Sequence, residues 1–299
     1  MNQQVSGYWN HWQQERERSG AVWTDWGDHP RILQHLQRDL FGSATTTVFD
    51  FLRGCDAGFP SGHALSLCSG DGGFEKLLVE HGVFASVVGI DLADQRVEGA
   101  NQRRGALADR LRYSVADANM GDFGVASYDV VFAKAALHHI ADLESMMRGM
   151  RRALRPGGHL VTIDFFGPTR FQWTDAQLAA VNHFLRHEVP ADLRRRADGS
   201  SVEVVERALP EQIEQMDPSE AVRSGELHPF IGQHMQLVHD FALGGTLLNL
   251  IFDATIVNNF RVDDERAMQV VDRAYALERD LMRRGDIGSD FRLMIARFG

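Results

Sequence analysis

The sequence is poor in cysteine, in positive charge and in long apolar runs, and each shortage excludes a class of protein. Its 299 residues include only Cys55 and Cys68, which we interpret as free thiols of a reducing compartment rather than a disulfide. Lys and Arg number 31 against 41 Asp and Glu, and the net charge of −10 poorly matches nucleic-acid phosphates. No run is long enough to cross a bilayer, and residues 1–20 lack the apolar segment of a signal peptide. We therefore expect a cytoplasmic protein with no nucleic-acid partner and no membrane insertion.

The sequence does contain a glycine-rich turn between a predicted strand and a predicted helix. Residues 64–69 alternate small and apolar side chains, as in a buried strand, and Gly70 and Gly72 interrupt the pattern before the helical run 74–78. Without a Cβ atom, these glycines allow a tight turn and the close approach of a ligand. The helix that follows points free N–H groups at the turn. The stretch therefore predicts a nucleotide-binding loop.

Acidic residues end the next two predicted strands. Asp91 closes the strand 87–91, 19 residues after Gly72, where an acid can accept hydrogen bonds from both ribose hydroxyls of an adenosine. Asp117 closes the strand 113–118, where an acid suits the adenine edge. A dinucleotide fingerprint requires a third glycine, but Glu75 occupies that position and argues against a nicotinamide site. The two acids predict a crevice at the carboxyl edge of a parallel sheet.

In this order and spacing, residues 60–166 resemble the class I S-adenosylmethionine-dependent methyltransferases. The glycine motif of that family reads acid-x-Gly-x-Gly-x-Gly, and here Ser66 replaces the acid that contacts the methionine amino group, while Cys68 replaces the first glycine. Residues 128–139 resemble the fourth strand with its loop, and 154–161 resemble the turn into the fifth. The resemblance implies S-adenosyl-L-methionine as the cofactor. It assigns the cofactor contacts to Ser66, Cys68, Gly70, Gly72, Asp91, Leu92, Asp117, Ala118 and Lys134.

The alternation of strands and helices predicts an α/β fold with a parallel, doubly wound sheet and helices on both faces. The resemblance implies seven strands, mostly parallel, with the last antiparallel beside the fifth. We assign residues 1–60 to an N-terminal helical lid and 167–233 to an inserted helical cap that shapes the substrate pocket. Residues 61–166 and 234–299 then form the Rossmann-like core, in which 247–257 is expected to be one helix.

Aromatic residues suggest how the site is covered. The tryptophans of the N-terminal segment either pack its helices onto the sheet or form a lid that excludes water, and the two interpretations are compatible. Tyr8 and Trp9 are the candidates for contact with the substrate from this segment. From the cap, Phe171 and Trp173 are further candidates, and Arg170 either binds an anionic substrate group or pairs with an acid of the cap. The tryptophans concerned are Trp9, Trp12, Trp23 and Trp26.

Two consecutive histidines are the main catalytic candidates. His138 and His139 follow the fourth predicted strand, where the methyl group would be transferred, and histidine titrates near working pH. We favour His139 as the base, although either imidazole can instead cap a loop or contact the cofactor. Asp164, at the end of the fifth strand, is a second base candidate or a polar wall of the pocket. The pair His183 and His187 has no evident third ligand, so no metal is expected.

Residues 167–173, 244–248 and 258–260 resemble a bacterial subgroup of these methyltransferases that is linked with glycan or secondary-metabolite pathways. The resemblance implies methyl transfer from S-adenosylmethionine to a small-molecule or glycan-pathway acceptor, at oxygen, and we expect a monomer or homodimer. The sequence lacks the Asn-Pro-Pro-aromatic and Pro-Cys motifs of nucleic-acid methyltransferases and the Gly-x-Ser-x-Gly motif of serine hydrolases. Two alternatives remain open. One is a nicotinamide-dependent oxidoreductase, against which Glu75 argues. The other is a non-catalytic partner protein with a methyltransferase fold, which Ser66 and Cys68 favour.

Overall fold

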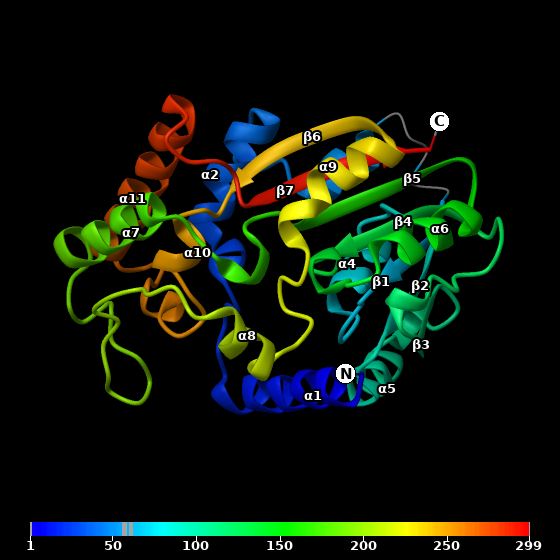
Figure 1. Ribbon diagram of the computed structural model, residues 1–299, viewed down its shortest axis with the longest axis horizontal. Coiled ribbons are helices and arrows are strands. Elements are labelled where there is room, and N and C mark those ends of the chain that lie inside the picture. Colours follow the sequence, from blue (N-terminus) through cyan, green and yellow to red (C-terminus); the bar gives the residue numbers. More distant parts are fainter. Residues whose placement is uncertain (1, 56–58, 60–61, 299) are drawn as a thin grey trace.

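A seven-stranded sheet forms the centre of the molecule (Figure 1), and the computed structural model describes residues 2–55, 59 and 62–298. The strand order is β3-β2-β1-β4-β5-β7-β6. Strands β1 to β5 pair in parallel, and β7 lies antiparallel between β5 and β6. The predicted α/β sheet with an antiparallel strand beside the fifth is confirmed. The strands are β1 (His63–Leu67), β2 (Ser86–Asp91), β3 (Leu111–Val115), β4 (Tyr128–Lys134), β5 (Leu154–Phe165), β6 (Gln236–Gly244) and β7 (Phe291–Arg297).

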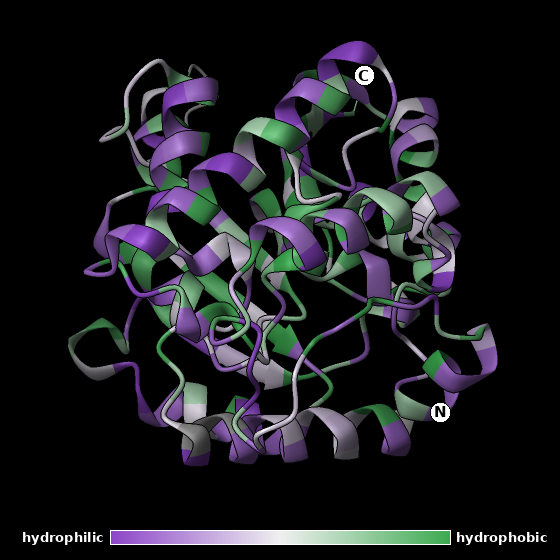
Figure 2. Ribbon diagram, turned by 90° about the vertical axis from the view of Figure 1, so that its left-hand side faces the viewer, coloured by the Kyte–Doolittle hydropathy of each residue, from purple (hydrophilic) through white to green (hydrophobic). Residues whose placement is uncertain are grey.

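Helices cover both faces of the sheet, and Figure 2 shows hydrophilic residues on the outer helices and hydrophobic ones in the interior. None of the described helices is both long and apolar enough to span a membrane. The helices are α1 (Asn2–Ser19), α2 (Pro30–Phe41), α3 (Val48–Gly54), α4 (Gly73–Glu80), α5 (Asp94–Gln102), α6 (Leu143–Ala153), α7 (Asp175–Glu188), α8 (Pro210–Met216), α9 (Ser224–His234), α10 (Leu248–Ile251) and α11 (Glu265–Arg284).

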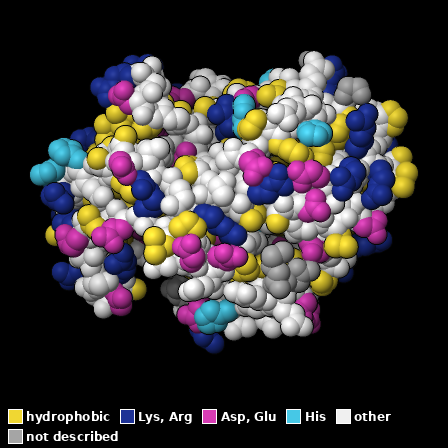
Figure 3. All heavy atoms as spheres, viewed as in Figure 1, with side chains coloured by type: hydrophobic (Ala, Val, Ile, Leu, Met, Phe, Trp, Pro, Cys, Tyr) yellow, Lys and Arg dark blue, Asp and Glu magenta, His cyan; other side chains and the backbone are white. Residues whose placement is uncertain are grey.

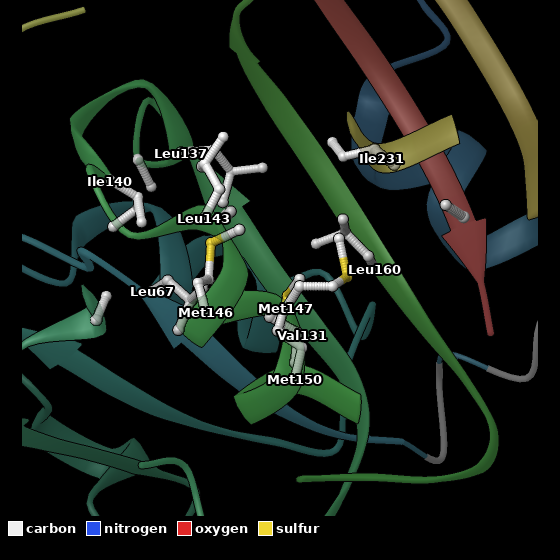
Figure 4. Close-up of a cluster of buried hydrophobic side chains, with 14 of the residues drawn as sticks. Leu67, Val131, Leu137, Ile140, Leu143, Met146, Met147, Met150, Leu160 and Ile231 are labelled. Carbon is white, nitrogen blue, oxygen red and sulfur yellow. The ribbon is translucent and has the colours of Figure 1, made fainter. Parts of the chain in front are cut away.

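The alternation of side chains along β1 explains why both faces are buried. Successive strand residues point to opposite faces, so Leu65 and Leu67 join the core under α6 and α9. Ala64, one position before Leu65, points to the opposite face and joins the core under α3, α4 and α5. On the first face, methionines of α6 fill the space above the strands, as Figure 4 shows for Met146, Met147 and Met150. The two layers fix the carboxyl ends of the strands relative to one another.

A second helical core lies beyond the ends of β5, β6 and β7. Helices α2, α7, α10 and α11 contribute Ile32, Val181, Ile251 and Val271 to one buried cluster. Figure 1 shows α7, α10 and α11 grouped together at one side of the sheet. Helix α7 belongs to the segment assigned to the cap, whereas its partners come from the segments on either side. One helix of the segment 167–233 therefore packs with helices from both of the segments that flank it in the sequence.

The sequence prediction of one helix over 247–257 is wrong. Helix α10 ends at Ile251, and a separate 3-10 turn covers Val257–Asn259. The Oδ1 atom of Asp253 accepts hydrogen bonds from the backbone N–H of Thr255 at 2.7 Å and from its hydroxyl at 2.5 Å. This local turn competes with the helix, because a short acidic side chain satisfies backbone donors without helical geometry.

Candidate active site

The loop between β1 and α4 adopts left-handed backbone conformations. Gly70 has a φ of +55° and Gly72 a φ of +73°. A Cβ atom at Gly70 would lie 2.3 Å from a guanidinium nitrogen of Arg96, and one at Gly72 would lie 2.6 Å from the ring of Tyr113. Only glycine fits both positions without displacing these side chains. The predicted cradle is present, with Arg96 and Tyr113 as its walls.

Cys68, which stands where the family has its first glycine, has a backbone conformation that favours glycine. Its φ is +50°, in the region that glycine adopts freely and other residues rarely do. A non-glycine residue at this φ strains the backbone by roughly 1–2 kcal/mol. Burial and the nearby carboxylate of Asp91 raise the pKa of the Cys68 thiol well above its usual value. The thiol therefore stays neutral and lines the cavity as a small uncharged group.

The two strand-end acids meet at the carboxyl edge, as predicted. The carboxylate of Asp91 accepts hydrogen bonds from the backbone N–H of Gly70 at 2.7 Å and of Ala93 at 2.8 Å. These contacts fasten the glycine loop to the end of β2. The carboxylate of Asp117 accepts from the backbone N–H of Asn119 at 2.9 Å, just beyond β3. Both acids face the same cavity.

That cavity has a volume of about 490 Å³, within the usual range for a small-molecule site. Its walls come from the glycine loop, the ends of β2, β3 and β4, the N-terminal segment and the loop after α8. Of the predicted cofactor contacts, the cavity is lined by Cys68, Gly70, Asp91, Leu92, Asp117, Ala118 and Lys134. Ser66 and Gly72 are instead buried behind the loop.

Ser66 is fully buried and contacts a second residue that the sequence did not assign to the site. Its hydroxyl donates a hydrogen bond of 2.7 Å to Oε1 of Glu75, in the first turn of α4. Glu75 is only 3% exposed and lines the cavity. Sequence reasoning used Glu75 only as evidence against a nicotinamide site. The available signal was an acid in the first turn of the helix that follows the glycine loop.

Helix α1 closes one side of the cavity. Figure 1 shows it along one side of the molecule, beside α5 and below α8. Val5, Trp9 and Trp12 line the cavity, and the guanidinium of Arg96 lies 5.3 Å from the centre of the Trp9 ring. Asn10 donates a hydrogen bond of 2.9 Å to Asp94 on α5. The N-terminal helix is thus attached to the helix that follows the ribose-end acid.

The other tryptophans of the N-terminal segment do not share this position. Trp26 is 4% exposed and packs edge-on against Phe291 of β7, and Trp23 packs edge-on against His29. Tyr8 contacts the ring of Trp9, and burial together with Glu220 raises its pKa. Both interpretations of the tryptophans therefore have a structural counterpart: two line the cavity and two pack the core.

His138 is held between two carboxylates. Its Nδ1 lies 2.5 Å from Oδ1 of Asp164, and its Nε2 lies 3.4 Å from Oε1 of Glu220. Asp164 is fixed in turn by the backbone N–H groups of Ala136 and Leu137. Burial alone would lower the pKa of His138, but the two carboxylates outweigh it and raise the value to about 10. At neutral pH this imidazole is a cation.

His139 has the opposite character. Burial and the positive charge of His138 lower its pKa, so the imidazole is neutral at neutral pH. Its Nδ1 lies 3.1 Å from the hydroxyl of Ser219, and that hydroxyl donates a hydrogen bond of 2.7 Å to Asp217. Because the hydroxyl has one proton, Nδ1 carries the hydrogen in this arrangement, which leaves the lone pair on Nε2. His139 lines the cavity and packs edge-on against Trp9 at 5.2 Å.

The cap residues predicted to contact substrate lie around the loop 217–220. Arg170 donates hydrogen bonds to the backbone carbonyls of Pro218 at 2.9 Å and Glu220 at 2.8 Å. Phe171 packs against Phe165 and stacks on Trp173. Within the described residues these three side chains are not part of the cavity wall. Arg170 shapes the loop that supports both histidines, and its contact with substrate stays a prediction.

Three of these residues also satisfy the geometry for a cation. His138, His139 and Glu220 each offer one ligand atom, and the three atoms lie within 4.8 Å of one another. Glu220 comes from a loop more than 80 residues further along the sequence, so the sequence did not predict this set. The carboxylate pairing described above satisfies His138 without an ion. The rings of His183 and His187 lie on an exposed face of α7, tilted by 45° with their centres 4.6 Å apart.

The comparisons with known proteins agree with this arrangement. A family model described as "Methyltransferase domain" matches residues 65–162, which include the glycine loop, both strand-end acids and the two histidines. Residues 65–162 thus match a methyltransferase domain, in agreement with the resemblance that the sequence shows to S-adenosylmethionine-dependent methyltransferases.

Among curated proteins, the 27-O-demethylrifamycin SV methyltransferase of Amycolatopsis mediterranei (strain S699) is 41% identical over 81 residues, covering 26% of this chain and 30% of that protein. The demethylmenaquinone methyltransferase of Deinococcus radiodurans is 32% identical over 104 residues, covering 35% of this chain and 43% of that protein. The chain thus spans less than half the length of these relatives. Among solved structures, a geranyl diphosphate methyltransferase in complex with S-adenosylmethionine has a TM-score of 0.49 at 14% identity, with 88% of this chain and 89% of that chain covered.

Proposed function

We propose that this chain transfers a methyl group from S-adenosylmethionine to a hydroxyl oxygen of a small-molecule acceptor. The observation that carries the proposal is one cavity lined by the glycine cradle, two strand-end acids and a neutral histidine. Each of these elements has a separate role in such a transfer. The roles follow from the chemistry of the side chains.

The residues present fit the cofactor. The glycine loop has no room for a Cβ atom and leaves backbone open to a ligand. Asp91 would accept hydrogen bonds from the ribose hydroxyls, and Asp117 would accept one from the adenine amino group. Lys134, one of two lysines in the sequence, would face the methionyl carboxylate. When bound, the cofactor supplies a methyl group that its sulfonium makes electrophilic.

His139 would take the proton of the acceptor hydroxyl. Its lowered pKa keeps the imidazole neutral, and Ser219 holds the Nδ1 hydrogen so that Nε2 presents a lone pair. His138 cannot be the general base, because the carboxylates of Asp164 and Glu220 keep its imidazole protonated. The cation of His138 instead keeps its neighbour from being protonated. We therefore assign His139 as general base and Asp164 as the residue that fixes His138.

The cover formed by α1 would exclude water from the transferred group. Trp9 and Trp12 present flat apolar surfaces to the cavity, and Trp9 also packs against the proposed base. A closed site strengthens the electrostatic interactions within it and favours an apolar acceptor.

A small molecule suits this cavity better than a polymer. Acidic and basic side chains are interspersed on the face in Figure 3, over a chain of net charge −10. A nucleic-acid partner requires a basic surface. The name of the Amycolatopsis relative describes a methyltransferase acting on 27-O-demethylrifamycin SV, and this supports an oxygen acceptor in the present chain.

A label-transfer experiment tests the proposal. The enzyme would be incubated with S-adenosylmethionine labelled in its methyl group and a whole extract of the source cells, which is afterwards separated into small molecules and nucleic acid. We expect label in an organic product with wild type and not with His139→Asn, while His183→Asn, on an exposed helix face, behaves as wild type. Label found only in nucleic acid, or equal label with His139→Asn, would contradict the proposal.

A further inference from the structure

Glu75 carries a buried carboxylate oxygen that the protein itself does not satisfy. Its Oε1 accepts the hydrogen bond from Ser66, whereas its Oε2 is buried and has no hydrogen-bond partner among the described residues. A buried polar atom without a partner costs about 1–3 kcal/mol, and more when the group is charged. Because Glu75 lines the cavity, a bound ligand can provide the missing donor.

The charged and titratable groups around Glu75 leave its carboxylate available to a cationic ligand. Burial and Asp71 in the glycine loop raise its pKa, Ser66 and Lys134 lower it, and the net result is a pKa of about 7. Tyr113 on β3 also faces it, with a pKa raised by burial and by Glu75 itself. Lys134 does not form an ion pair with Glu75 within the described part of the chain. Its ammonium lies over the ring of Phe74, 5.2 Å from the centre.

The position of Glu75 on the sheet edge indicates which end of a bound ligand would lie next to it. Asp91 and Asp117 lie at the ends of β2 and β3, where the nucleoside would bind. Glu75 lies over β1 and Lys134 ends β4, on the other side of the glycine loop. The end of the cofactor opposite the nucleoside is an amino acid, which presents one ammonium and one carboxylate. These charges complement Glu75 and Lys134 respectively.

We propose that Glu75 binds the ammonium group of the cofactor's amino-acid end, and that Ser66 is the residue that positions it. The inference rests on the proposed function, because it takes S-adenosylmethionine as the ligand. The acid that the family places on β1 has been replaced by serine, and an acid nine positions later supplies a carboxylate from the first turn of α4. The serine hydroxyl then holds one oxygen and leaves the other free for the ligand.

Two ligands that differ in the amino-acid end provide the test. S-adenosylhomocysteine has the ammonium, and 5′-methylthioadenosine has the same nucleoside without it. In titration calorimetry, Glu75→Gln should lower the affinity for S-adenosylhomocysteine by about tenfold to hundredfold, which is the scale of a hydrogen bond to a charged group. The same variant should bind 5′-methylthioadenosine as wild type does, which also shows that it is folded. Glu80→Gln, on the exposed face of the same helix, is the control and should bind both ligands normally.

The pH dependence and a rescue variant separate binding from a structural role. Wild-type affinity for S-adenosylhomocysteine should fall as pH decreases through about 7, as the carboxylate takes up a proton, and Glu75→Gln should lack this dependence. Ser66→Asp combined with Glu75→Gln should recover part of the lost affinity. Equal weakening of both ligands, or of neither, would overturn the proposal. If the wild type binds neither ligand, the proposed function itself fails, and the two failures are thus distinguished.

Discussion

The Nδ1 atom of His138 lies 2.5 Å from Oδ1 of Asp164, while Nδ1 of the neighbouring His139 is 4.0 Å from Oδ2 of Asp217, the carboxylate nearest to it on that side. Adjacent histidines in one loop thereby hold opposite charge states. Two carboxylates raise the pKa of His138, and the resulting cation lowers that of His139. A similar division of roles occurs wherever environments push the pKa values of neighbouring groups apart.

The first prediction concerns the proposed base. His139→Asn keeps a polar side chain but cannot take up a proton, so turnover should fall by about 10²–10⁴-fold, the usual range for a general base. Affinity for S-adenosylhomocysteine should change little, because the proposed contacts come from other residues. Steady-state rates and calorimetry on the same preparation measure both quantities. Unchanged turnover in His139→Asn would contradict the assignment.

The pH profile of the wild type follows from the same assignment. The neutral form of His139 is the active one, and its pKa lies below the ordinary value of about 6.5. Activity should therefore rise with pH through a value below 6.5 and then level off. In a His138→Gln variant the neighbouring cation is absent, so the midpoint for the remaining activity should move to higher pH. A midpoint that stays in place would contradict the coupling between the two rings.

A second prediction concerns stability. His138 has a folded-state pKa of about 10, above its unfolded value of about 6.5. Its contribution to the free energy of unfolding is therefore complete below pH 6.5. That contribution is lost as pH rises from about 6.5 to 10. The pKa of Asp164 is lowered, so its contribution is instead lost under acid conditions. Urea unfolding should show wild type losing stability across the alkaline range, and His138→Gln should lack this slope. His187→Gln, on the exposed face of α7, should keep it.

A third prediction concerns α1. Trp9 lines the cavity and contacts both His139 and Arg96, so S-adenosylhomocysteine should quench or shift tryptophan fluorescence and protect α1 from protease. Trp9→Ala should lose most of the fluorescence change and bind about 2- to 10-fold more weakly, the scale of one aromatic contact. Trp23→Phe, in the separate contact with His29, should retain it. Equal cleavage of α1 with and without ligand would reduce these tryptophans to packing residues.

A fourth prediction concerns metal ions. Asp164 and Glu220 already balance His138, so prolonged treatment with EDTA should leave turnover unchanged. Added Zn²⁺ should inhibit, because His138, His139 and Glu220 can bind it and thereby occupy the base. The inhibition should weaken in Glu220→Gln. Loss of activity in EDTA that a divalent ion restores would show that the cluster is a working metal site.

The sequence predicted the parts of the site that a short stretch of chain determines. The glycine loop, Asp91 and Asp117 each follow a strand that the pattern of apolar residues predicts. Parallel strands bring their carboxyl ends to the same edge of a sheet, so these residues lie close together. Glu220 and Asp217 could not be found this way, because a loop far along the chain brings them to the histidines. The sequence shows Glu75 as an acid in the first turn of a predicted helix, but the role of this acid depends on its contact with Ser66. The length of α10 depended on the local turn at Asp253.

The central claim is that the cavity binds S-adenosylmethionine, and titration calorimetry with S-adenosylhomocysteine and with NADH tests it most directly. We expect S-adenosylhomocysteine to bind and to raise the melting temperature, since a ligand specific for the folded state stabilises it. Asp91→Ala should weaken binding by about 1.5–3 kcal/mol, the scale of hydrogen bonds to a charged group, whereas Asp109→Ala, at an exposed site, should not. Binding of NADH without binding of S-adenosylhomocysteine would contradict the account.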